Sequence, residues 1–197
     1  KQMVIDDVNT NLNAKLTIED FDLTFITTFP NMSVEIHDAK LTGIKEFKDV
    51  ELMKIKTLTA HVGFWSVIGG DQVEIDEIHI VEPIIDFRIL KNGLANYDIL
   101  KPDTEKTKEE IEEPSSFKLS LKKYTITNAR IKYDNCASDM FAELINVNHS
   151  GSGDLTADIV DFETKTTIDK LTYRMEGLNY LTEVKTDADI NLLIKFK

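Results

Sequence analysis

The chain has 197 residues, of which 42% are hydrophobic and 29% are charged, so it is long enough for one or two domains with buried cores. Its net charge of −12 argues against nucleic acid as a partner, because phosphate binding requires clustered Lys and Arg. The same charge argues against electrostatic docking on an anionic lipid surface, although it does not exclude uncharged acyl chains.

Residues 3–12 have apolar side chains at helical spacing and predict the end of a helix. After them a period of two predominates, which is typical of β-strands. Segments 34–41, 53–62 and 73–80 each show apolar steps of two residues, then one step of three, then two again. A helix does not give this pattern, because these positions would scatter around its circumference. An ideal strand does not give it either, since its second half would face the other way.

One extra residue at the step of three would keep the apolar side chains on one face, as a β-bulge does while adding bend and twist. A break between two strands explains the spacing equally well. Segment 117–133 repeats the pattern, and segment 188–196 keeps a period of two with mostly polar alternate positions. One wet and one dry face are typical of an antiparallel sheet. The predicted fold is mostly β, a curled antiparallel sheet or groove with a few short helices.

Asn92-Gly93 is a strong hairpin signal, and it lies between predicted strands at 84–90 and 95–100. Pro83 predicts the start or the edge of a strand, because it cannot donate a hydrogen bond to a neighbouring strand. Residues 45–52 are expected to form one or two short helical turns.

Residues 103–113 carry six acidic side chains and a single apolar one, so we expect an exposed linker over 102–115. This linker divides the chain into an N-terminal β-groove unit at 1–101 and a second β-sheet unit at 116–197 that continues the groove. Later in the chain, Gly151-Ser152-Gly153 separates two further predicted strands.

The four histidines are His37, His61, His79 and His149, and none has a second His or Cys at the spacing of metal ligands. We expect ordinary surface or half-buried imidazoles, no metal and no cofactor. The single cysteine, Cys136, is expected to be buried or half-buried. Since no phosphate loop, nucleophile motif or catalytic dyad is present, the chain is not expected to be an enzyme.

Phe64 and Trp65 form an aromatic pair with two interpretations. They could insert into a bilayer interface, where Trp is favoured, or plug the open end of a sheet as core residues. The core interpretation is favoured. The chain begins at Lys1 and stops at Lys197 directly after an apolar strand, so we expect a fragment of a longer protein. It contains no run of roughly 20 apolar residues that would span a membrane and no secretory signal.

Several short sequence segments, taken together in the order in which they occur, resemble those of a known protein family. They are LNAKLTI at 12–18, FPNMSV at 29–34, GFWS at 63–66, VEIDEI at 73–78, NGLANYD at 92–98, YTITNA at 124–129 and GLNYL at 177–181. In this order they resemble the N-terminal region of AsmA-like proteins of Gram-negative bacteria. That family is related to the bridge-like lipid transfer proteins with a repeating β-groove.

The resemblance implies an inner-membrane helix before Lys1 and a body in the periplasm. It also implies a long curled sheet that moves phospholipid or supports outer-membrane biogenesis, with no catalytic residues. The physical case is that a dry sheet face must be covered, and helices here are too few to cover it. Either the face lines a groove for phospholipid acyl chains, or dry faces pack together in a structural β-sandwich repeat of an envelope or surface protein.

The residues expected to face lipid share the apolar positions of the predicted strands, and the aromatic pair is the possible interface or groove cap. The first set comprises Val34, Ile36, Leu58, Val73, Ile75, Ile78, Leu119, Leu121, Ile190, Leu192 and Ile194, and the second comprises Phe64 and Trp65.

Overall fold

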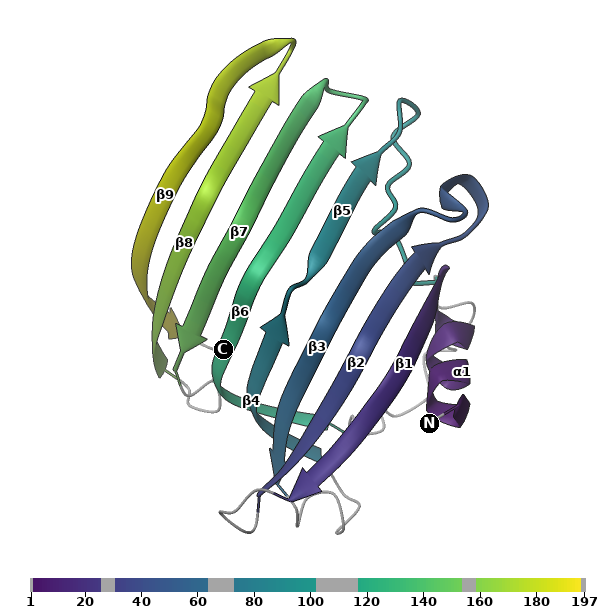
Figure 1. The fold of residues 1–197 in the computed structure, drawn as a ribbon, viewed down its shortest axis with the longest axis vertical. Coiled ribbons are helices and arrows are strands. Elements are labelled where there is room, and N and C mark those ends of the chain that lie inside the picture. Colours follow the sequence, from purple (N-terminus) through teal and green to yellow (C-terminus); the bar gives the residue numbers. More distant parts are fainter. Residues whose placement is uncertain (1, 26–30, 64–72, 102–116, 154–158, 196–197) are drawn as a thin grey trace.

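The computed structural model describes residues 2–25, 31–63, 73–101, 117–153 and 159–195, which form one large sheet with a short helix at its edge (Figure 1). This confirms the predicted mostly-β fold and the helix expected at 3–12. The elements are α1 (Gln2–Asn11), β1 (Ala14–Phe25), β2 (Asn31–Gly43), the 3-10 helix η1 (Lys45–Phe47), β3 (Glu51–Gly63), β4 (Val73–Val81), β5 (Ile84–Ile89), β6 (Phe117–Asn135), β7 (Met140–Ser152), β8 (Ile159–Met175) and β9 (Leu178–Lys195).

The strands follow the order β1-β2-β3-β4-β6-β7-β8-β9, and β5 lies between β3 and β6 in line with β4. Pro83 separates β4 from β5 at the predicted strand start, because its nitrogen has no hydrogen to donate. Every pairing is antiparallel except those of β4 and β5 with β6, which are parallel. The predicted antiparallel pattern therefore holds on both sides of this junction but not at the junction.

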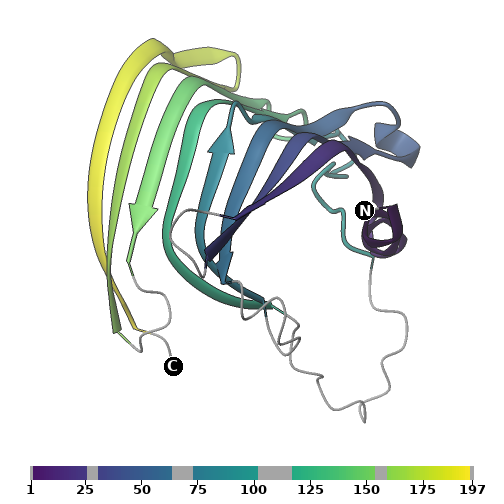
Figure 2. The ribbon, with the colours of Figure 1, turned by 60° about the horizontal axis from the view of Figure 1, so that its bottom comes forward.

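The strands bow along their length in the same sense, so that the sheet arches (Figure 2). The steps of three in the sequence fall inside continuous strands, so the strand-break alternative is wrong for 34–41, 53–62 and 73–80. In β2 the odd step contains Asp38, which has a positive φ of 47°. In β6 it contains Asn128, with a φ of 55°, where the register with β7 also shifts. Around Asn128 the apolar residues Ile126, Ala129 and Ile131 stay in one cluster, as expected for a bulge. Across Asp38 the register of β2 with β1 and β3 does not change, so this irregularity inserts no extra residue.

The irregular residues of neighbouring strands lie next to one another and form a line across the sheet. Lys56, which lies opposite Asp38, donates to Glu82 over 2.9 Å, and the backbone N–H of Glu82 donates to Thr127. Further along, the backbone N–H of Asn128 donates to the side chain of Asn148. Next to Asn128, on the other face of the sheet, Ala129 is fully buried at 0% exposure. It packs in one cluster with the buried Val147 and Ile168.

Helix α1 covers part of the free edge of β1. The side chain of Asn9 accepts a hydrogen bond from the backbone N–H of Leu16 over 2.7 Å and donates to the carbonyl of Leu16 over 3.0 Å. It thus replaces a neighbouring strand at this position, which limits unwanted pairing of the edge. Nearby, Leu12 and Ile99 pack on a buried cluster that includes Ala14 and Leu41.

The Asn92-Gly93 turn is confirmed, but the second strand expected after it at 95–100 is wrong. Gly93 has a φ of 84°, and its N–H donates to the carbonyl of Leu90. Beyond the turn, Asn96 is buried and its side chain bonds both the N–H of Arg88 and the carbonyl of Asp86. These side-chain bonds replace a regular ladder, and 95–100 contains only isolated bridges, from Ala95 to Ile89 and from Leu100 to Leu12.

Three smaller expectations have mixed outcomes. Cys136 is exposed in the turn between β6 and β7, so the expected burial is wrong. Within 45–52 only Lys45–Phe47 are helical, as the single turn η1, and β3 begins at Glu51. Strand β7 continues through Gly151 to Ser152, because the absent side chain leaves room for the ring of Tyr124. The acidic linker lies outside the described residues, and the division into two units stays a prediction, although the sheet runs continuously from β3 through β4 and β5 to β6.

Candidate apolar binding face

Cross-strand register assigns side chains to the two faces of the sheet, because directly paired residues point the same way. On one side the rows that cross the sheet are mostly apolar, and we call this side the apolar face. One row consists of Phe21, Ile36, Leu58, Ile80 and Ile126, and the next consists of Leu23, Val34, Ala60, Ile78, Tyr124, Gly151, Thr164 and Ile190.

Most residues that the sequence singled out lie on this face. They are Val34, Ile36, Leu58, Ile75, Ile78, Ile190, Leu192 and Ile194. Val73 pairs with Phe117, and Leu119 pairs with Ile75. Leu121 is buried beside a register shift between β4 and β6, so its pairing assigns it to neither face. Phe64 and Trp65 lie outside the described residues.

The apolar face is most exposed near the two edges of the sheet. Leu23 on β1 is 56% exposed and Ile190 on β9 is 48% exposed, whereas Leu58 and Ile78 in the middle are half-buried. The described residues contain no second sheet that would pack on this face. Among the described residues, Leu12 and Ile99 pack near its α1 end. Within this part of the chain, most of the apolar face is not covered by another element.

A small polar cluster interrupts the apolar face on β6, β7 and β8. The hydroxyl of Tyr124 lies 2.7 Å from Nε2 of His149, and Nδ1 of His149 lies 2.8 Å from the hydroxyl of Thr166. Burial raises the pKa of the Tyr124 phenol, so the hydroxyl stays protonated at neutral pH. The ring of Tyr124 also stacks on Phe162. The three polar groups satisfy one another, which allows them to lie among apolar side chains.

Sequence reasoning missed this cluster, although a signal was present. His149 follows Val147 and precedes Gly151 at a period of two, and these alternate positions share a face with Ile126 and Tyr124 across the strand. The register was needed to bring Thr166 beside the imidazole.

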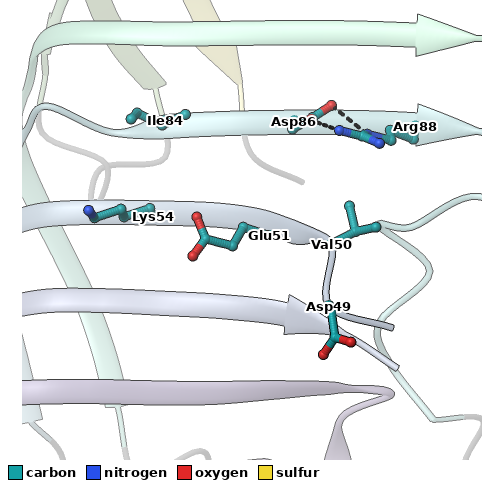
Figure 3. Close-up of a pocket in the computed structure, with 7 residues that line it drawn as sticks. All are labelled: Asp49, Val50, Glu51, Lys54, Ile84, Asp86 and Arg88. Atoms are coloured by element: carbon teal, nitrogen blue, oxygen red, sulfur yellow. Dashed lines mark hydrogen bonds and ion pairs between the residues drawn. The ribbon is translucent and has the colours of Figure 1, made fainter. Parts of the chain in front are cut away.

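A polar hollow lies over β3 and β5 (Figure 3). Its lining includes Lys54, Asp86 and Arg88, and the guanidinium of Arg88 donates two hydrogen bonds to Asp86. The bond to Asp86 raises the pKa of Arg88, although burial opposes this rise. Because Arg88 is already paired with a carboxylate, the hollow offers a poor site for a second anion. Its lining residues contain no nucleophile beside a base.

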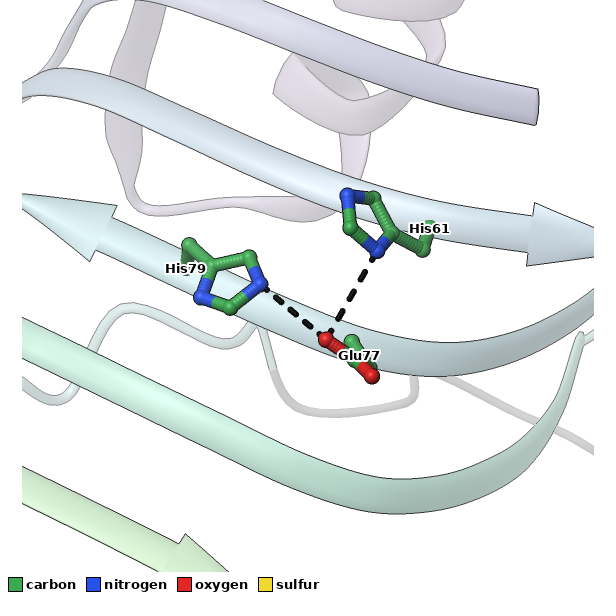
Figure 4. A group of neighbouring side chains, drawn as sticks. All are labelled: His61, Glu77 and His79. Atoms are coloured by element: carbon green, nitrogen blue, oxygen red, sulfur yellow. Dashed lines mark hydrogen bonds and ion pairs between the residues drawn. The ribbon is translucent and has the colours of Figure 1, made fainter. Parts of the chain in front are cut away.

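The structure also brings together two of the histidines that the sequence left apart. His61 and His79 flank Glu77 on the face opposite the apolar one (Figure 4). No helix among the described residues is both long and apolar enough to cross a membrane.

Comparison with known proteins agrees with the resemblance seen in the sequence. The model of the AsmA family matches residues 1–192, whereas no curated protein and no solved structure gives a significant match. Proteins of this family belong to the cell envelope, are linked to lipid transport and are in general not enzymes. A match over nearly the whole length, together with the sheet described above, shows that the chain belongs to the AsmA family.

Proposed function

We propose that this chain binds phospholipid acyl chains on its apolar face and takes part in phospholipid transfer or outer-membrane biogenesis. The observation that carries the proposal is the mostly apolar row that runs from Leu23 on β1 to Ile190 on β9 across the paired strands, beside the polar cluster of Tyr124, His149 and Thr166. Each methylene removed from water contributes about 0.8 kcal/mol. Ten covered methylenes would therefore contribute about 8 kcal/mol before the cost of ordering the acyl chain.

The arch of the sheet would place the apolar face on the inside of a groove, with charged headgroups left at its rim. The net charge of −12 fits this arrangement, because the acyl chains and not the headgroups would supply the binding energy. In the full-length protein, the groove would lie in the periplasm and an upstream helix would anchor it to the inner membrane. We further propose that 1–101 and 116–197 contribute to one continuous surface, with the acidic segment at 102–115 as an exposed linker.

The proposal is tested by native mass spectrometry of the chain purified from a Gram-negative host, with lipid extraction of the same sample. The expected result is a co-purifying phospholipid that is lost when Ile36, Ile78 and Ile190 are all replaced by Ser. A matched control replaces Glu35 and Asp189, which point to the face opposite the apolar one, by Ser, and this variant should keep the lipid. Acyl-chain binding would be refuted if the unmodified chain purified without lipid, or if the triple variant and the control variant lost lipid equally.

The competing function is a structural repeat whose apolar face packs on another protein surface. The exposed apolar side chains of edge strand β9 would favour it if they formed a subunit contact. Light scattering separates the two functions. The structural function predicts a lipid-free oligomer that dissociates when Ile190 and Leu192 are replaced by Ser, and the lipid function predicts a lipid-loaded chain whose oligomeric state does not change with these two replacements.

A further inference from the structure

Three side chains with metal-binding atoms converge on β3 and β4, on the polar face of the sheet, which lies opposite the apolar face. His61 on β3 is paired directly with Glu77 on β4, and His79 lies two residues further along β4 on the same face. The Glu77 carboxylate oxygen lies 3.7 Å from Nδ1 of His61 and 3.3 Å from Nε2 of His79 (Figure 4). The three donor atoms all lie within 4.8 Å of one another.

These separations are close to those that a zinc ion requires. Zinc binds imidazole nitrogen and carboxylate oxygen at about 2.0–2.2 Å, so tetrahedral ligand atoms lie about 3.3–3.4 Å apart. The separation of Glu77 from His79 already has this size, that from His61 is 3.7 Å, and small side-chain rotations would bring the two imidazoles closer. Two histidines and one glutamate are a common three-ligand set for zinc with a fourth position left open.

A neighbouring strand orients one of the imidazoles. The hydroxyl of Thr125 on β6 lies 2.7 Å from Nδ1 of His79, which leaves Nε2 directed at Glu77. Metal-binding histidines typically use their second nitrogen in this way. The ring of His61 meets that of His79 edge-on at a centroid distance of 5.3 Å, so both rings border the same small space.

The cluster is partly shielded from water, with side-chain exposures of 32%, 37% and 29% for His61, Glu77 and His79. It also lies where the register between β3 and β4 shifts, between His61 and Val62. An ion at this point would hold the two strands together across the irregularity.

We propose that His61 through Nδ1, Glu77 through its carboxylate and His79 through Nε2 bind one divalent transition-metal ion, with Zn²⁺ as the ion that best matches this ligand set. Water or a ligand from outside the chain fills the fourth position. The ion fixes the pairing of β3 and β4 and is independent of the acyl-chain site, because it lies on the other face of the sheet. Without a metal, Glu77 would simply accept a hydrogen bond from Nε2 of His79, with Nδ1 of His61 at 3.7 Å.

Zinc titration of the metal-free chain by calorimetry tests this site, with Co²⁺ absorption as a report on tetrahedral geometry. One Zn²⁺ per chain is expected, and zinc should raise the melting temperature. Glu77→Gln and His79→Gln should each weaken binding at least tenfold, and Thr125→Val, which removes the orienting hydroxyl, should weaken it about tenfold.

His37→Gln provides the matched control. His37 lies on the same polar face between Asp22 and Glu35, at 3.3 and 3.5 Å, and among the described residues it belongs to no cluster with a second imidazole. This variant should bind zinc within twofold of the parent chain. Absence of zinc binding by the parent chain, or equal binding by the parent and Glu77→Gln chains, would overturn the proposal.

Imidazole nitrogen NMR of the unmodified chain gives a second test that does not depend on the folding of any variant. Zinc should shift two histidines, one bound through Nδ1 and the other through Nε2. Shifts at His37 or His149 in their place would contradict the assignment.

Discussion

Replacing Gly151 by Ala should destabilise the chain through one identifiable collision. A Cβ atom at Gly151 would lie 2.3 Å from Cε1 of the Tyr124 ring. The ring cannot easily move away, because its hydroxyl is bonded to His149 and its other contacts include Phe162. Overpacking of this kind costs about 1–3 kcal/mol, and a broken Tyr124–His149 hydrogen bond would cost about 1 kcal/mol more.

The assay is urea unfolding followed by circular dichroism, applied to a double-mutant cycle. In the parent chain, Gly151→Ala should lower the free energy of unfolding by about 2–4 kcal/mol. In a Tyr124→Ala background the collision partner is absent, so the same change should be neutral or stabilise by up to about 1 kcal/mol through the unfolded state. Equal destabilisation in both backgrounds would show that the collision with Tyr124 is not the cause.

Three further changes probe other parts of the sheet. Ile168→Ala in the buried centre should cost about 2–5 kcal/mol in urea unfolding, whereas Leu193→Ala, at a side chain that is 67% exposed, should stay within about 0.5 kcal/mol. Asn9→Ala should remove both hydrogen bonds to the backbone of Leu16, so the Leu16 amide should exchange its hydrogen faster than in the parent chain. Because the folded-state pKa of Tyr124 is raised, its stabilising effect is complete below about pH 10 and is lost as the pH rises through the folded pKa. Unfolding measured from pH 9 to 11 should therefore show a steeper loss of stability in the parent than in Tyr124→Phe, and parallel curves would contradict this.

Local patterns predicted the strands well because each strand has one dry face. The period of two located β2, β3, β4 and β6, and the steps of three pointed to the backbone irregularity at Asp38 and the bulge at Asn128. A bulge leaves this trace because one extra residue must be accommodated while the apolar side chains stay on the same side.

Pairing between distant strands left no such trace. The parallel junction between β4 and β6 depends on the path of the chain between β5 and β6, which the apolar spacing does not encode. The failed strand at 95–100 has the same origin, because the side chain of Asn96 bonds β5 in place of a regular ladder. The cluster of His61, Glu77 and His79 likewise required a cross-strand register that the sequence alone did not reveal.

The most direct test of lipid binding compares adjacent residues that point to opposite faces of the same strand. A photo-cross-linking residue is placed at Ile36 or Glu35 on β2 and at Ile190 or Asp189 on β9, in cells, and the covalent products are analysed by mass spectrometry. Binding on the apolar face predicts phospholipid adducts at Ile36 and Ile190 and none at Glu35 and Asp189. Adducts at all four positions, or protein adducts alone at Ile36 and Ile190, would contradict it.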